Sequence, residues 1–302
     1  MDPSCHLPQH DGTLAENFSG FSPDLHLDNT MSRCNNPNPV RTNSFEYKGY
    51  TSFIATILQN RHHNELKILE FSNVTAKDFE VISPDHRPLK SIRLTYNYAT
   101  KALAVKMLGC PHEFITRLFE YRIHDNLIAL NVEEDVNPTG AYTSTFGDWA
   151  KEPDSSWNFA MTNERRVVLE VGSSETAARL KGDARGWLES TGSSVVACVT
   201  INIEENSLIF DVWQRGSRTY PISSRNFLCP AIKTQHVEII NGRGDFQIRG
   251  YKLAGSTTVV TEELRFKLEL FTAKTSEEDL VITRTDLLKL AKRFWSWRAS
   301  LN

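Results

Sequence analysis

One stretch, residues 151–188, constrains the fold more than any other part of the chain, because it joins an apolar strand, a tight turn and an amphipathic helix. Within residues 166–171, RVVLEV, the apolar side chains alternate and Glu170 faces the opposite side from its two neighbours. A carboxylate inside a buried strand is costly unless a partner compensates it. We expect Gly172 to end the strand, and the apolar residues of 177–188 recur at helical spacing. The stretch therefore predicts a strand followed by a helix that packs on a sheet.

The remaining sequence predicts further strands and helices in alternation, which indicates an α/β fold. The clearest signals are a hairpin, a helix that begins at a proline, a pair of strands and a C-terminal helix; they lie at 91–108, from Pro111, at 194–213 and from Thr285 or Asp286. Shorter strands are expected at 128–132, 142–145 and 264–271, and residues 51–60 fit a helix or a strand.

Residues 1–45 are rich in Asn, Pro, Ser and Asp and predict a disordered tail. The apolar content, 40% of the 302 residues, is enough for a sizeable core in the rest of the chain. We therefore expect one domain at 46–302, with its core at about 110–215 and a β-containing extension before that core.

The net charge of −3 gives no global preference for nucleic acid, so such a partner needs a local basic patch. The basic residues of the C-terminal helix (Lys289, Lys292, Arg293 and Arg298) predict a solvated face, and a phosphate-contacting strip is the sharper alternative. The five cysteines form no CxxC pair, which argues against a zinc site and favours a reducing compartment. With no signal-peptide pattern and no membrane-length apolar run, we expect a soluble intracellular protein.

Three carboxylates lie on separate predicted elements and are candidates for divalent-cation chemistry. Asp154 follows Pro153 in a turn, Glu170 lies inside the next strand, and Glu113 lies in the first turn of the helix that begins at Pro111. Hydrolysis of a phosphodiester with a divalent cation needs hard oxygen ligands that converge on one point. Each acid also has an ordinary structural interpretation: a capped turn for Asp154, a salt bridge with Lys181 or Arg166 for Glu170, and stabilisation of the helix start for Glu113.

The order of these elements resembles the PD-(D/E)xK restriction-endonuclease-like superfamily. Four segments, CPHE, KEPDSSW, VVLEVGSSE and LKGDARGWL, more closely resemble a widespread group of uncharacterised fungal proteins with that core; they lie at 110–113, 151–157, 167–175 and 180–188. The resemblance implies a mixed central sheet flanked by helices, Mg²⁺ held by acidic side chains, and nucleic acid as the partner. Carried onto this chain, it implies that Glu113, Asp154 and Glu170 are the acidic positions.

The superfamily places a lysine two residues after the strand acid, and this chain has Gly172 there. Some relatives move the basic residue onto the following helix, which makes Lys181 the preferred substitute and Lys151 a poorer one. The resemblance thus implies a Mg²⁺-dependent nuclease with a displaced lysine. The alternatives are an inactive nuclease-like fold that acts as a binding or scaffold module, and an enzyme for another phosphoester.

Overall fold

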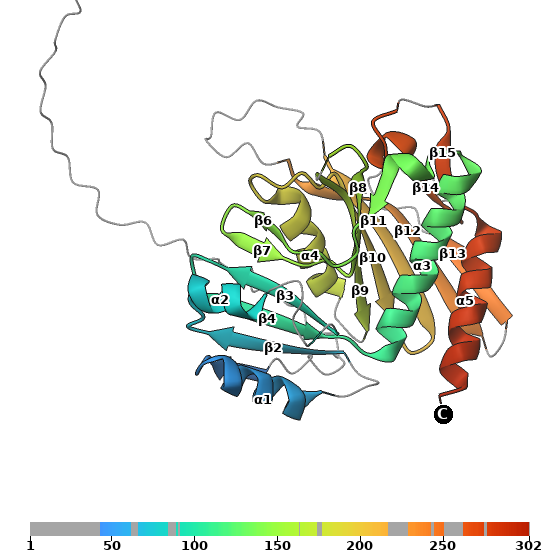
Figure 1. The fold of residues 1–302 in the computed structure, drawn as a ribbon. Coiled ribbons are helices and arrows are strands. Elements are labelled where there is room, and N and C mark those ends of the chain that lie inside the picture. The colour runs from blue at the N-terminus through green and yellow to red at the C-terminus, as the bar shows by residue number, and fades with distance from the viewer. Residues whose placement is uncertain are drawn as a thin grey trace, which may run out of the picture. The chain divides into compact units, whose positions relative to one another are not determined.

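The computed structural model describes residues 43–61, 66–83, 89, 91–162, 164–173, 177–216, 229–242, 245–250, 262–274 and 277–301. Its described strands form two larger mixed sheets and one two-stranded sheet, and its helices flank them (Figure 1). The predicted α/β class, with a mixed central sheet flanked by helices and a β-containing N-terminal region, is confirmed. The predicted tail lies outside the described residues up to position 42.

The first sheet contains six strands in the order β1-β2-β4-β3-β7-β6. Their bounds are β1 (Asn43–Glu46), β2 (Lys67–Ser72), β4 (Ala102–Met107), β3 (Ile92–Asn97), β7 (Trp149–Lys151) and β6 (Ser144–Phe146). One face of this sheet is apolar and packs with residues of α1 (Tyr50–Asn60) and α2 (Ala76–Ile82). A capping box begins α2, because the Thr75 hydroxyl accepts the backbone N–H of Asp78 while the Asp78 carboxylate accepts that of Thr75.

The second sheet contains seven strands in the order β13-β12-β11-β10-β9-β8-β5. Their bounds are β13 (Asp245–Gly250), β12 (Ala231–Gly242), β11 (Ser207–Arg215), β10 (Ala197–Ile203), β9 (Arg165–Ser173), β8 (Ser155–Phe159) and β5 (Val136–Pro138). Strands β9 and β10 are parallel and are joined through α4 (Ala177–Glu189), whereas β8 and β11 run antiparallel to them. The succession α3, β8, β9, α4 is the order that the resemblance implies.

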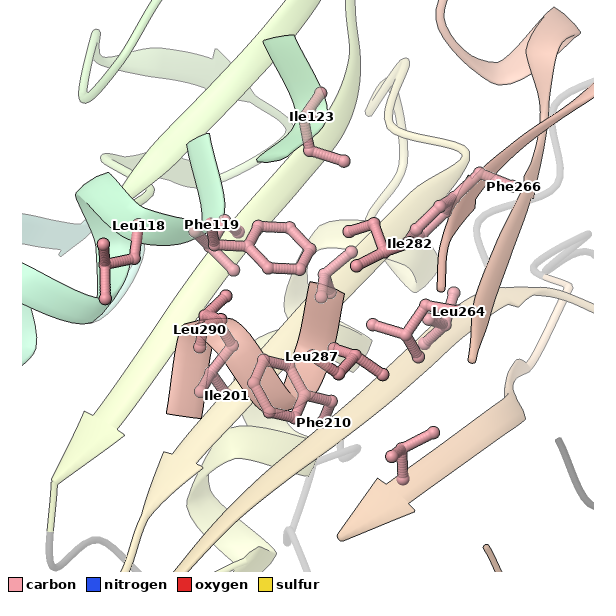
Figure 2. Packing of buried hydrophobic residues seen from close by; sticks show 14 of the residues in the cluster. Leu118, Phe119, Ile123, Ile201, Phe210, Leu264, Phe266, Ile282, Leu287 and Leu290 are labelled. Atoms are coloured by element: carbon pink, nitrogen blue, oxygen red, sulfur yellow. The ribbon is translucent and has the colours of Figure 1, made fainter. Parts of the chain in front are cut away.

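Alternation along β9 sends side chains to two different cores. Val167, Leu169 and Val171 enter the larger core, which α3 (Cys110–Ala129) and α5 (Arg284–Ala299) cover, together with β14 (Leu264–Lys267) and β15 (Asp279–Ile282). Figure 2 shows this packing, with Phe119 of α3 and Leu287 of α5 near Phe210 of β11. Val168 faces the opposite side and packs with Trp187 of α4. The predicted two-sided strand is therefore confirmed.

The structure corrects several predicted boundaries. Strand β9 does not end at Gly172, because Gly172 pairs with Asn202 and the ladder continues to Ser173. Strand β1 begins at Asn43, so residues 43–45 belong to the first sheet and not to the predicted tail. The undecided segment 51–60 is helical and lies in α1.

Two other boundaries differ because apolar side chains outside regular strands also enter the core. Residues 128–132 hold the end of α3 and a turn, and Val132 is buried although it is not in a strand. Within 264–271, β14 ends at Lys267, and a 3₁₀ turn (Leu268–Leu270) buries Leu268 in the same core. Apolar residues at every second position therefore predicted a longer strand than the one that forms, because β14 ends at Lys267.

The C-terminal helix begins earlier than predicted, and its exposed face is basic. Thr283 is the N-cap, since its hydroxyl accepts the backbone N–H of Asp286. Lys289, Lys292 and Arg293 are exposed, as predicted for a solvated face, while Arg298 is half-buried over the Trp295 ring. None of the helices in the described part of the chain is long and apolar enough to span a membrane.

Candidate active site

The candidate site forms where the chain passes from one sheet into the other. Strand β7 pairs with β3 in the first sheet and ends at Lys151, and strand β8 of the second sheet begins at Ser155. Glu152 ties the start of this crossing to β3: its backbone N–H donates to the Leu94 carbonyl, and its carboxylate accepts the Leu94 N–H at 3.0 Å. The Pro153-Asp154 turn therefore sits at a fixed point between the sheets.

Asp154 and Glu170 are both buried at this crossing, with side-chain exposures of 0% and 3%. The backbone N–H of Asp154 donates to the Leu169 carbonyl, and one Asp154 oxygen, Oδ2, accepts the N–H of Val171 at 2.7 Å. These bonds dock the turn onto β9 on both sides of Glu170. Two acids that lie 16 positions apart in the sequence are thereby brought to one place.

The cation between these acids comes from the first sheet. The Lys106 ammonium on β4 lies 2.8 Å from Asp154 Oδ2 and 3.6 Å from Glu170 Oε2, and it donates to the Val171 carbonyl at 2.6 Å. Arg93 is the cross-strand partner of Lys106 on β3, so both side chains leave the sheet on the same face. Arg93 Nε lies 3.7 Å from Asp154 Oδ1.

The other oxygen of Glu170 is held from α4 and β7. The indole N–H of Trp187 donates to Glu170 Oε1 at 2.6 Å, and the Lys151 ammonium lies 3.5 Å from the same oxygen. Lys151 also contacts the Asp183 carboxylate at 2.7 Å. Glu170 is thus oriented with Oε1 toward α4 and Oε2 toward Lys106.

The first turn of α3 contributes His112 and Glu113. The His112 Nε2 atom is fully buried and lies 3.0 Å from Asp154 Oδ2. Glu113 is more exposed, at 37%, and contacts Arg93 at 3.3 Å. Glu113 therefore joins the cluster through Arg93, whereas Asp154 and Glu170 approach the same ammonium.

Burial and neighbouring charges shift the two acids in opposite directions. Burial raises the pKa of the Glu170 carboxyl to about 7, although Lys151 and Lys106 act against this shift. Burial also acts to raise the pKa of Asp154, but His112, Lys106 and Arg93 outweigh it and lower that pKa. Burial lowers the pKa of His112, which favours its neutral form. A pair of acids whose pKa values separate in this way is a common feature of catalytic sites.

Lys181, the substitute amine preferred from sequence, is exposed on α4. Asp183, two residues later on α4, reaches the cluster through the Lys151 ammonium. The amines near Glu170 are those of Lys106 and Lys151, and the role of Lys181 stays a prediction.

Sequence reasoning also missed Lys106 and Arg93, because they lie before the expected core. A signal for Lys106 was present: it is a lone lysine in the otherwise apolar strand ALAVKM, just as Glu170 is a lone acid in its strand.

The described cluster encloses very little empty space. A cavity of about 20 Å³ is lined by side chains of both sheets and α4, including Arg93, Lys106, Lys151, Glu170 and Arg179. A volume of this size holds about one water molecule. A phosphodiester therefore reaches these acids only if the cluster opens.

Two carboxylates of this site are of the chemical type that binds a divalent cation. Among the described residues, no group of three or more His, Cys, Asp or Glu side chains is arranged to hold a metal ion. Mg²⁺ commonly takes only one or two carboxylates from a protein and completes its shell with water and substrate phosphate. Within the described part of the chain, the buried Asp154 Oδ1 accepts no hydrogen bond, and Glu170 Oε2 has only the 3.6 Å approach of Lys106. One oxygen of each acid is thus suited to a cation.

Comparisons with known proteins give a limited result. No protein-family model and no curated protein matches the chain. A matching crystal structure from Anabaena variabilis is described as a "putative nuclease belonging to DUF820"; it is 14% identical, and the match covers 51% of this chain and 91% of that one at a TM-score of 0.35. A likeness at this level assigns neither an activity nor site residues to the present chain.

Proposed function

We propose that the chain is a Mg²⁺-dependent phosphodiester hydrolase that acts on nucleic acid. The observation that carries the proposal is the convergence of Asp154 and Glu170 on a single cation, the Lys106 ammonium, within 3.6 Å of both. Acids from a turn and a strand reach one point only because the crossing segment docks on β9. The sequence resemblance implies the same two acids as metal ligands.

In this proposal each residue has a separate role. Asp154 and Glu170 hold the cation, which when bound activates water and stabilises charge on the phosphoryl oxygens. Lys106 replaces the lysine that is absent at Gly172, since its amine already lies at the acid pair. Trp187 and Lys151 position Glu170, and Glu113 supports the cluster through Arg93.

The test is cleavage of plasmid and of single-stranded DNA and RNA oligonucleotides by the full chain with Mg²⁺ or Mn²⁺. We expect Glu170→Gln and Asp154→Asn to reduce cleavage to background, because each removes a metal-binding charge while keeping the side-chain volume. Lys77→Ala, at the exposed face of α2, is the matched control and should cleave like the wild type. Cleavage that survives Glu170→Gln rejects the proposed site.

The same cleavage assay decides which lysine supplies the amine. Loss of cleavage in Lys106→Met with retention in Lys181→Ala assigns the role to Lys106. The reverse pattern returns it to Lys181, as first expected from sequence.

A second candidate, an inactive nuclease-like fold that serves as a binding or scaffold module, is favoured by the burial of the site. Asp154 and Glu170 are almost inaccessible, and protein cations already compensate them. In that case Mg²⁺ neither binds nor supports cleavage, and Glu170→Gln changes stability alone.

A further inference from the structure

We propose that the Lys106 ammonium competes with a divalent cation for Asp154 and Glu170, so that the first sheet sets the metal affinity of the acid pair. The inference rests on the proposed function only in taking these two acids as the metal ligands. It adds that the site contains its own monovalent competitor.

The Lys106 ammonium lies between the two acids. Its nitrogen lies 2.8 Å from Asp154 Oδ2 and 3.6 Å from Glu170 Oε2, so it sits beside Asp154 Oδ1 and Glu170 Oε2, the two oxygens suited to a shared cation. A divalent cation placed there would meet a like charge at close range. Binding of one therefore requires displacement of the other.

The positive charge of Lys106 compensates the two buried carboxylates. Asp154 and Glu170 are buried, and a buried acid is stable in its charged form only when it is paired. Removal of the Lys106 charge leaves the pair with less compensation in the same low-dielectric place. The acid pair then gains affinity for any small cation that reaches it.

Lys106 reaches the acids from the first sheet, whereas Glu170 lies in the second. Its strand, β4, is held between β2 and β3, and the side chain is only 12% exposed. The ammonium also donates to the Val171 carbonyl, which fixes it beside β9. The competitor is therefore a fixed part of the fold and not a mobile surface lysine.

The experiment measures Mn²⁺ binding to the full chain by isothermal titration calorimetry, for the wild type and for Lys106→Met. We expect the Met variant to bind Mn²⁺ about tenfold more tightly or better, and the double variant Lys106→Met/Glu170→Gln to lose that gain. Lys101→Met is the matched control, because Lys101 is exposed at the turn before the same strand. It should bind like the wild type.

Lys106→Arg keeps the charge and should also bind no more tightly than the wild type. A folded Met variant with unchanged or weaker Mn²⁺ affinity overturns the inference, and so does a gain of the same size in Lys106→Arg. If the Met variant fails to fold, Lys106→Gln gives the same test. If neither folds, acetylation of Lys106 in the wild type decides: labelling should increase as Mn²⁺ is added, and constant labelling overturns the inference.

The outcomes separate this inference from the proposed function. Tighter Mn²⁺ binding by Lys106→Met, with no cleavage by any variant, supports competition and rejects the hydrolase. Cleavage by the wild type, with unchanged Mn²⁺ affinity in Lys106→Met, keeps the hydrolase and rejects competition.

Discussion

The hydrogen bond from Trp187 to Glu170 gives the sharpest stability test of the cluster. Trp187→Phe removes the indole N–H that donates to Glu170 Oε1 at 2.6 Å, and it shortens a fully buried side chain. A hydrogen bond to a charged group contributes about 1.5–3 kcal/mol. The vacated volume costs roughly a further 1–2 kcal/mol, a fraction of the cost of truncating a buried tryptophan to alanine. The expected loss of unfolding free energy is therefore about 2.5–5 kcal/mol.

Trp213→Phe is the matched control, because Trp213 lies in the same hydrophobic cluster and donates its indole N–H to the neutral Thr200 hydroxyl at 3.2 Å. Its hydrogen bond contributes only about 1 kcal/mol, so the expected loss is about 2–3 kcal/mol. Urea unfolding followed by far-UV circular dichroism measures both losses without relying on tryptophan emission.

The difference between the two variants should also depend on pH. The Glu170 pKa is about 7, so at about pH 8 the carboxylate is mostly ionised and its bond to Trp187 is at its strongest. At about pH 6 the carboxyl is mostly protonated, and the excess loss of Trp187→Phe should shrink. Equal losses for Trp187→Phe and Trp213→Phe at both pH values would refute a charged hydrogen bond at Glu170.

Two further predictions concern Glu170 itself and the start of α5. Burial raises the Glu170 pKa from 4.5 to about 7, so the folded state retains a proton that the unfolded state releases. This contribution is complete below the unfolded pKa and is lost as the pH rises through the folded one; Glu170→Gln should therefore flatten the pH dependence of stability over that window by up to about 3 kcal/mol. An unchanged slope in urea titrations across the window would contradict the shift. Thr283→Ala removes the N-cap of α5 and should cost about 1 kcal/mol, whereas the exposed Thr285→Ala should cost a few tenths of that in thermal melts, and the opposite ranking would move the cap to Thr285.

The local structure around Glu170 could be predicted because its sequence signals are local. Alternation in RVVLEV and helical spacing in the following segment depend on side-chain direction within one element. Both were confirmed, since Val168 and Glu170 face α4 while Val167 and Leu169 face the larger core. We expected Gly172 to end β9 because glycine weakens a strand. The strand continues because Gly172 pairs with β10.

The composition of the site could be predicted only in part, because its cations arrive through long-range strand pairing. Nothing near Asp154 in the sequence indicates that Lys106 will face it, since that contact depends on β7 pairing with β3 and on β3 pairing with β4. The preference for Lys181 assumed that a missing lysine is replaced from the next helix. The amine that contacts Asp154 in the structure is that of Lys106, 48 positions earlier in the sequence. The roles assigned to Glu113, Asp154, Glu170, Lys181 and Mg²⁺ remain predictions.

The crossing from β7 to β8 has a consequence for how this protein can be divided. A fragment that begins at α3 keeps Asp154, Glu170 and the whole seven-stranded sheet, yet it lacks β3, the strand that pairs with β7. Its acids would lose Arg93 and Lys106, and β7 would pair with β6 alone. Such a fragment would show an acid pair with fewer compensating charges than the protein has. The seven-stranded sheet with its acids is therefore not a separable module, and a minimal fragment must include the residues that precede α3.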